Sequence, residues 1–264
     1  MPRDASSYDG FVAEFYDQVT PYADRQDLKF FSALAAAAPG PVLELGCGTG
    51  RIMLPMLRAG AEVCGIDSSR AMLGVCVEKL AREPEALRDR AHLMLAAMRD
   101  FTLGRHFALA VAPFRGFQHL LSVEDQLACL DRIRVHLSPG GRCVLDLFNP
   151  SLKALTDPSR DEVFGQEPPF RMADGRVVTR GHRILSRNFG EQTSDVELIY
   201  DVTYPKGGRE RFVHAFPMRW LYRFEAEHLL ARAGFKVEAV YEDYAETPFS
   251  GKEGGELVLV ASRD

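Results

Sequence analysis

The sequence predicts an α/β protein whose parallel sheet is covered by helices on both faces. Between residues 39 and 150, short apolar runs alternate with amphipathic segments of helical length. The first run, Val42-Leu-Glu-Leu45, is mainly apolar rather than alternating, as is typical of strands buried on both faces. Strands that alternate with helices in this way form parallel sheets. After Asn149-Pro150 the pattern changes, and the sequence there favours antiparallel strands.

The elements of the first part follow from their apolar spacing and their caps. Ser68 or Ser69 is placed to cap the second helix, and Ser122 begins a capping box in which Asp125 stands in for Glu. Pro139-Gly-Gly ends the helix that follows Ser122. We therefore expect helices at residues 52–59, 68–81 and 122–138, and strands at residues 42–45, 61–66, 93–98, 107–113 and 142–148.

The flanking parts complete one domain, 1–264. Residues 8–38 look helical, within an N-terminal segment 1–38 that precedes the core, 39–150. The insert, residues 151–222, contains three stretches rich in β-branched and aromatic residues, which predict an antiparallel sheet. The C-terminal part, 223–264, contains a helix closed by Gly234 and two strands. The three insert strands are expected at 176–186, 195–204 and 211–217, the helix at 224–233, and the last strands at 235–244 and 256–261.

Composition limits the partners of this chain. It is 46% hydrophobic and 26% charged, which is typical of a globular protein. A net charge of -5 gives no basic surface for phosphates, so no nucleic-acid partner is expected. No apolar stretch approaches the roughly 20 residues that a membrane span requires, so we expect no membrane partner and a cytoplasmic location.

Cysteine and histidine spacing predicts neither disulfides nor a metal site. An odd number of cysteines without a C-x-x-C pair argues against a disulfide framework. The seven histidines show no spacing suited to zinc. No metal is therefore expected, and the cysteines are predicted to be small buried residues: Cys47, Cys64, Cys76, Cys129 and Cys143.

A glycine-rich turn follows the first strand. Gly46, Gly48 and Gly50 lie where that strand passes into a helix, so a ligand can approach the main chain without meeting a Cβ atom. Asp67 follows Gly46 by 21 positions and ends the second strand. An acid at this place accepts hydrogen bonds from ribose hydroxyls. The combination predicts a nucleoside site.

Details of the turn separate the candidate nucleosides. A dinucleotide loop would place glycine at Arg51 and would seldom carry an acid at the position of Glu44, and no Tyr-x-x-x-Lys pair is present. An NAD-dependent oxidoreductase is therefore disfavoured. The nine residues Val42-Leu-Glu-Leu-Gly-Cys-Gly-Thr-Gly50 instead resemble the first motif of class I S-adenosylmethionine-dependent methyltransferases. The resemblance extends over most of the chain. It implies a Rossmann-like seven-stranded mixed sheet, with the last strand antiparallel between the fifth and sixth, and S-adenosylmethionine as cofactor.

The resemblance also assigns cofactor contacts. The three glycines would flank the methionine part, Asp67 would hold the ribose, and Ser68 would lie near the adenine. Met98 falls in a segment whose Met backbone packs by the adenine ring, but Ala97 replaces the acid that contacts the adenine amine in relatives. The cofactor contacts expected in full are Tyr16, Glu44, Gly46, Gly48, Gly50, Asp67, Ser68, Met98 and Pro113, with Glu44 at the amino end of the cofactor.

Three further features resemble the small-molecule branch of the family, which includes aminosugar N,N-dimethyltransferases. Phe15-Tyr16-Asp17 resembles a lid segment whose Tyr covers the methyl-donor pocket, Pro113-Phe-Arg-Gly-Phe-Gln-His119 follows strand four, and the antiparallel insert follows strand five. The resemblance implies methyl transfer to nitrogen or oxygen of a small molecule. A non-catalytic module that keeps the cofactor fold is the alternative, favoured by Ala97 and Ala108.

Methyl transfer mainly requires alignment of the acceptor with the methyl group, and a general base is optional. His119 is the leading catalytic candidate because it follows strand four at the ligand-binding edge of the sheet. Its alternative is a capping or core histidine. Tyr16 is the second catalytic candidate, and packing within an amphipathic segment is its alternative.

The acceptor pocket is expected where lid, strand ends and insert meet. Its candidates have structural alternatives too: Tyr22 could simply pack, Arg115 and Arg219 could lie at the surface, and Asn149, like Asp146 at the end of strand five, could anchor a loop. The insert could also form the interface of a homodimer. The substrate-binding candidates are Tyr22, Arg115, Asn149 and Arg219.

Overall fold

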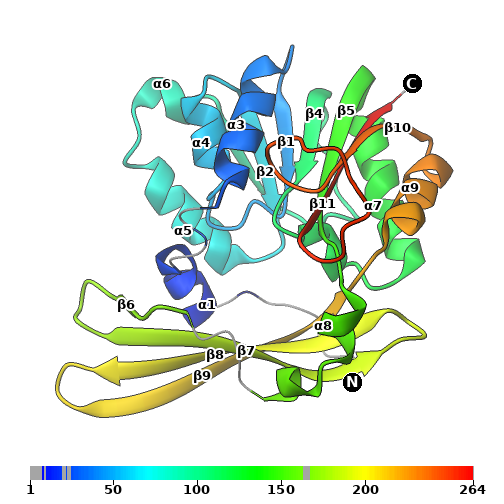
Figure 1. The fold of residues 1–264 in the computed structure, drawn as a ribbon. Coiled ribbons are helices and arrows are strands. Elements are labelled where there is room, and N and C mark those ends of the chain that lie inside the picture. The colour runs from blue at the N-terminus through cyan, green and yellow to red at the C-terminus, as the bar shows by residue number, and fades with distance from the viewer. Residues whose placement is uncertain (1–7, 9, 20–21, 23–24, 163–166, 264) are drawn as a thin grey trace.

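The computed structural model of the chain describes residues 8, 10–19, 22, 25–162 and 167–263. A seven-stranded sheet with helices on both faces forms the upper layer in Figure 1, and a four-stranded antiparallel sheet forms the lower layer. Helix α1 (Phe11–Phe15) lies between the two sheets (Figure 1). Both the α/β core and the antiparallel insert predicted from the sequence are confirmed.

The large sheet has the strand order β10-β11-β5-β4-β1-β2-β3. Neighbouring strands among β1 to β5 are parallel, whereas β11 is antiparallel to both β5 and β10. The expected antiparallel last strand between the fifth and sixth is therefore confirmed. The strands span Val42–Leu45 (β1), Val63–Asp67 (β2), Ala91–Leu95 (β3), Phe107–Ala112 (β4), Leu137–Phe148 (β5), Phe235–Tyr241 (β10) and Glu256–Arg263 (β11).

Serine caps begin two of the helices beside this sheet, as the sequence predicts. The Ser69 hydroxyl accepts a hydrogen bond from the Met72 amide, and the Ser122 hydroxyl accepts one from the Asp125 amide. These bonds satisfy amides that the helix itself leaves without partners. The helices are α4 (Met53–Arg58), α5 (Arg70–Leu80), α6 (Glu85–Arg88), α7 (Val123–His136) and α9 (Arg223–Arg232).

Two apolar clusters cover opposite faces of the large sheet. Successive residues of β1 belong to different clusters, because side chains alternate across a strand: Leu43 packs with α7 and α9, and Val42 packs with α3 and α4. Each cluster is buried, so the carboxyl edge of the sheet is held rigidly from both sides. The loops at that edge therefore have a fixed support.

The N-terminal segment differs from the single helical segment expected over residues 8–38. It forms α1, the short 3-10 helix η1 (Tyr16–Gln18) and α3 (Asp27–Ala37), with Val19 already extended after η1. Pro21 follows in the sequence, and a proline disfavours helix at the residue before it. A third cluster, formed by Phe15 with Val178, Tyr200 and Val202, packs this segment against the insert.

The insert begins with α8 (Leu152–Thr156) and the 3-10 helix η3 (Pro158–Asp161). Its sheet has the order β6-β7-β8-β9, and the three strands expected from the sequence are confirmed. The fourth strand has only two residues and leaves no pattern in the sequence. The strands are β6 (Phe170–Arg171), β7 (Val177–Asn188), β8 (Thr193–Tyr204) and β9 (Gly208–Arg219). Among the described residues, no helix is long and apolar enough to cross a membrane.

Candidate active site

The glycine turn between β1 and α4 is a main-chain cradle. Gly46 and Gly48 have φ angles of 68° and 54°, a left-handed conformation that glycine adopts without strain. The amides of Gly46 and Cys47 both donate to the Ile66 carbonyl, at 2.8 and 3.0 Å, which fixes the turn against the end of β2. At Gly50 a Cβ atom would lie 2.6 Å from Cys76 Sγ and from Leu54 Cδ1, so this glycine serves helix packing.

Asp67 is held at the end of β2 by two main-chain amides. Its Oδ2 accepts from Gly48 N at 2.8 Å and its Oδ1 accepts from Ser69 N at 2.7 Å. A carboxylate offers about four acceptor positions, and ribose hydroxyls are donors of the kind that it accepts. The predicted partnership of the turn with Asp67 is thus a direct contact.

A pocket of about 850 Å³, its open mouth included, lies over the turn. Of the residues that the sequence singled out, nine line it: Tyr16, Glu44, Gly46, Gly48, Asp67, Ser68, Met98, Pro113 and His119. The pocket also has a lining that the sequence reasoning missed, above all Tyr8, Arg51, Met72 and Phe114.

Glu44 lies on β1 beneath the turn and is fully buried. Burial raises the pKa of its carboxyl group to about 8, although the Arg51 guanidinium acts in the opposite direction. Its Oε2 has no hydrogen-bond partner among the described residues. A buried acceptor without a partner is costly unless a ligand donor meets it, and an ammonium group is the donor best suited to a carboxylate.

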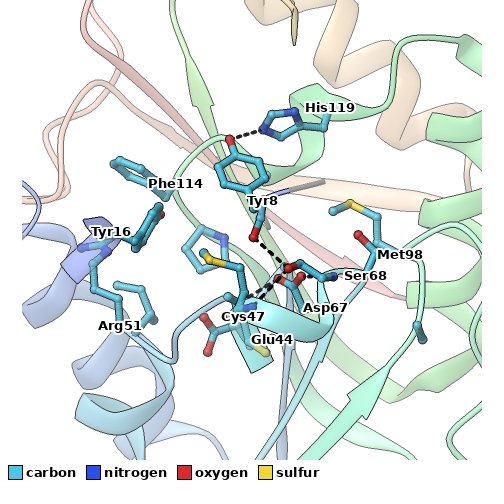
Figure 2. A pocket seen from close by; sticks show the side chains of 18 residues that line it. Tyr8, Tyr16, Glu44, Cys47, Arg51, Asp67, Ser68, Met98, Phe114 and His119 are labelled. Atoms are coloured by element: carbon cyan, nitrogen blue, oxygen red, sulfur yellow. Dashed lines mark hydrogen bonds between the residues drawn. The ribbon is translucent and has the colours of Figure 1, made fainter. Parts of the chain in front are cut away.

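His119 ends the 3-10 helix η2 (Gly116–His119) at the opposite wall of the pocket (Figure 2). Its Nε2 lies 3.2 Å from the Tyr8 hydroxyl, and the Tyr8 ring packs between His119 and His214 of β9. Burial, followed by the nearby His214, lowers the pKa of His119 to about 4. The ring is therefore neutral at pH 7, and its Nδ1 has no hydrogen-bond partner within the described part of the chain.

An aromatic and cationic wall closes the side near Tyr16. The Phe114 ring lies between two guanidinium groups, with Arg25 Cζ and Arg51 Cζ each 4.8 Å from its centroid. The Tyr16 ring faces both Tyr22 and Phe114. Arg51, the residue that takes the place of the dinucleotide glycine, forms a bidentate pair with buried Asp27 at 3.0 and 2.6 Å.

Gly50 and the four acceptor candidates lie outside the pocket lining. Tyr22 packs on Phe114 and accepts a hydrogen bond from Arg180, and Arg115 lies over the Phe148 ring and pairs with Glu256. Asn149 Nδ2 donates to the carbonyls of Lys252 and Gly254. Arg219 binds the Leu121 carbonyl and Glu225. The cofactor role of Gly50 and the acceptor roles of these four residues stay predictions. No metal-binding group of side chains occurs among the described residues.

These features fit an S-adenosylmethionine molecule. The glycine turn and Asp67 suit a nucleoside, Met72, Ala96 and Met98 give an apolar slot for a flat ring, and Glu44 suits an ammonium group. The lining residues come from the N-terminal segment and from the core, between Tyr8 and His119, so the pocket forms only when these segments fold together (Figure 2).

Known proteins resemble the chain in sequence and in structure. Residues 42–141 match a family model described as a methyltransferase domain. The chain is 26% identical over 263 residues to the cypemycin N-terminal methyltransferase of a Streptomyces species, covering 97% of this chain and 98% of that protein. It is 26% identical to the dTDP-3-amino-3,6-dideoxy-alpha-D-glucopyranose N,N-dimethyltransferase of Streptomyces fradiae, covering 88% and 87%. The structure of the CcbJ methyltransferase from Streptomyces caelestis matches with a TM-score of 0.74 and 26% identity, covering 99% of this chain and 100% of that one.

The matches to these relatives span the N-terminal segment, the core and the insert alike. Neither the oxidoreductase nor the non-catalytic alternative gains support from them. The chain is an S-adenosylmethionine-dependent methyltransferase with the class I fold.

Proposed function

We propose that this enzyme methylates an amine nitrogen of a small molecule, and that His119 orients the acceptor. The observation that carries the proposal is the state of His119. It is half-buried and neutral and lies at the pocket wall, with Nδ1 unpaired among the described residues. The relatives agree with this proposal, since one is named as an N-terminal methyltransferase and another as an aminosugar N,N-dimethyltransferase.

The cofactor supplies a methyl group already activated on a sulfonium. The protein then has to hold the acceptor in line and exclude water. We assign the methionine part to the main chain of Gly46 and Gly48, its ammonium group to Glu44, and the ribose to Asp67. Ser68, Met98 and Pro113 are assigned to the nucleoside, with Ala97 leaving out one adenine contact, and Tyr16 closes the pocket from the lid.

The low pKa of His119 favours nitrogen over oxygen as the methylated atom. A side chain with a pKa near 4 is a weak base, so it gives little help to a hydroxyl that must lose its proton during transfer. A neutral amine needs no such help. The unpaired Nδ1 can accept an amine N–H, which turns the nitrogen lone pair toward the methyl group, and the product ammonium gives its proton to solvent afterwards.

The test compares paired acceptors that differ in one group. Release of S-adenosylhomocysteine is measured with aminosugars and with the corresponding sugars that carry a hydroxyl in place of the amine. We expect turnover at least about a hundredfold faster on the amine, because a hydroxyl lacks a general base here and such a base contributes about 10² to 10⁴. Faster turnover on the hydroxyl member of a pair would contradict the proposal.

The homodimer stays a prediction. The face of the insert that points away from the core carries exposed Val213 and the ion pairs Arg183–Glu197 and Arg211–Asp201, a mixture suited to a self-complementary surface. Light scattering of the chain and of a Val213→Glu variant measures this. A dimer that the variant converts to monomer would support the prediction, and a monomeric parent would exclude it.

A further inference from the structure

Two consecutive residues after β4 adopt a backbone conformation that side chains disfavour. Phe114 has a φ angle of 52° and Arg115 one of 66°, although neither is glycine. Such a conformation persists only where neighbouring groups hold it, and it is common where a site is preorganised. The question is therefore which group holds this turn.

Asp146 of β5 meets both residues of the turn. Its carboxylate Oδ2 accepts from Phe114 N at 2.8 Å, and its main-chain carbonyl accepts from Arg115 N at 3.0 Å. The Asp146 side chain is fully buried, which strengthens a hydrogen bond to a charged acceptor. Asp146 thus accepts hydrogen bonds from the main-chain amides of both residues that have a positive φ angle.

A second layer of contacts fixes Asp146 itself. The Tyr244 hydroxyl, from the loop between β10 and β11, donates to the same Oδ2 at 2.9 Å. Arg25 donates to the Tyr244 hydroxyl and forms an ion pair with Glu256 at 2.7 Å. The Oδ2 atom is therefore held directly by Phe114 and Tyr244 and indirectly by Arg25, whereas Oδ1 has no hydrogen-bond partner among the described residues.

The Phe114 side chain links these contacts to the pocket. Its ring lines the same pocket as Gly46, Gly48 and Met98 (Figure 2). The guanidinium groups of Arg25 and Arg51 both lie over this ring. Asp146 itself does not line the pocket. Asp146 can therefore influence the ligand through the turn that it holds, of which Phe114 and the neighbouring Gly116 line the pocket.

We propose that Asp146 is a positioning residue, which holds the 114–115 turn in its left-handed form and so fixes the Phe114 wall of the cofactor pocket. The proposal concerns the cofactor side of the site and does not depend on which atom is methylated. Its failure would leave the choice of acceptor untouched.

The ionised carboxylate is the form that holds the turn best, because a charged acceptor makes the stronger hydrogen bond. Burial and the neighbouring Glu256 raise the pKa of Asp146 to about 6, against Arg25 and the two hydrogen bonds, which lower it. Arg115, which pairs with Glu256, is the other charged group on this side. Affinity for S-adenosylhomocysteine should therefore fall as the pH drops through about 6.

Calorimetry with S-adenosylhomocysteine, with the melting temperature measured in parallel, tests the proposal at pH 7.5. Asp146→Ala removes the acceptor of the Phe114 amide and should weaken affinity about tenfold or more, the equivalent of one charge-assisted hydrogen bond. Asp146→Asn retains an oxygen for that amide and should stay within about threefold of the parent, but without the affinity change near pH 6.

Asp243→Asn is the matched control, because Asp243 also accepts from two main-chain amides, those of Ala245 and Thr247, but does not line the pocket. It should leave affinity and its pH dependence as they are. If Asp146→Ala does not fold, the test relies on how the affinity of Asp146→Asn and Tyr244→Phe for S-adenosylhomocysteine changes with pH. Parent-like affinity in folded Asp146→Ala, or an unchanged inflection near pH 6 in Asp146→Asn, would overturn the proposal.

Discussion

The two halves of the pocket are built differently. On the cofactor side, contacts join residues close in sequence: Gly48 and Asp67 are 19 positions apart, and Ser69 and Asp67 are 2 apart. On the side of His119 and Tyr16, the contacts join residues that are far apart, 111 positions for Tyr8 and His119 and 158 for Tyr22 and Arg180. The first half is local and uses the main chain, whereas the second depends on side chains from the lid and the insert.

This difference distinguishes the residues that the fold must retain from those that can vary. A main-chain cradle requires glycine at particular positions and tolerates few changes. A wall of side chains can be rebuilt without moving the sheet, so one fold can serve many acceptors. Mutations at the main-chain cradle should accordingly change cofactor affinity, whereas mutation of His119 in the second half should change turnover.

The largest effect is expected at Asp67. Asp67→Ala removes the ribose acceptor and the partner of two main-chain amides, and affinity for S-adenosylhomocysteine should fall about a hundredfold or more, as for two charge-assisted hydrogen bonds. Calorimetry measures this, with exposed Asp89→Ala as the control. A loss below about fivefold would show that the local half does not depend on this carboxylate.

His119→Ala should have the opposite signature. Turnover on an amine acceptor should fall at least about tenfold, since one oriented hydrogen bond is lost, while affinity for S-adenosylhomocysteine stays near that of the parent. Because the pKa of His119 is about 4, protonation of this ring should leave the rate unaffected between pH 6 and 8. Exposed His106→Ala is the control. Unchanged turnover in His119→Ala would remove the residue from the mechanism.

Ligand binding at Glu44 should change the number of protons bound to the protein. With a pKa of about 8, the carboxyl group is mostly protonated at pH 7 in the free protein and should ionise when it meets the ligand ammonium. Binding of S-adenosylhomocysteine at pH 7 should therefore release close to one proton, measured by calorimetry in buffers of different ionisation enthalpy. Glu44→Gln should abolish the release.

The raised pKa of Glu44 also determines how the stability of the fold depends on pH. A carboxyl group whose pKa is raised on folding contributes stability at low pH, and that contribution is lost as the pH rises through about 8. Glu44→Gln should thus melt at the same temperature as the parent or higher at pH 8.5. Equal proton release in parent and variant would mean that another group receives the ammonium.

The smallest effect is expected at the lid. Asp17 accepts from the Thr49 hydroxyl at 2.7 Å and pairs with Lys79 at 2.8 Å, which ties η1 to the glycine turn. Asp17→Asn should weaken S-adenosylhomocysteine binding about threefold, since partly exposed pairs contribute little. Glu83→Gln, which breaks the outlying Arg58–Glu83 pair, should have no effect. Equal values for the two variants would show that the lid does not contribute to cofactor binding.

Sequence reasoning predicted the local half well and the long-range half poorly. The serine caps and the glycine turn followed by Asp67 were predicted from short-range spacing, and the strand order was implied by the family resemblance; all are present. Tyr8 and His214 carry no motif, because they meet His119 only through folding of the lid and the insert. The break in the N-terminal helix was missed since helical spacing continues on both sides of Pro21.

The structural roles of Arg51 and Asp146 could not be predicted from the sequence either. The sequence used Arg51 only as evidence against a dinucleotide, yet its pairing with Asp27 places its guanidinium group over Phe114. Asp146 stood out only as a polar strand end, and its importance depends on a φ angle of 52° at Phe114, which no spacing reveals. Side-chain networks between distant segments have to be seen in the fold.

A crystal structure with S-adenosylhomocysteine tests the central assignment most directly. The account predicts its amino acid part along the main chain of Gly46 and Gly48, its ammonium group at Glu44 and its ribose hydroxyls on the Asp67 carboxylate. Density for the ligand elsewhere, or a ribose without contact to Asp67, would contradict it.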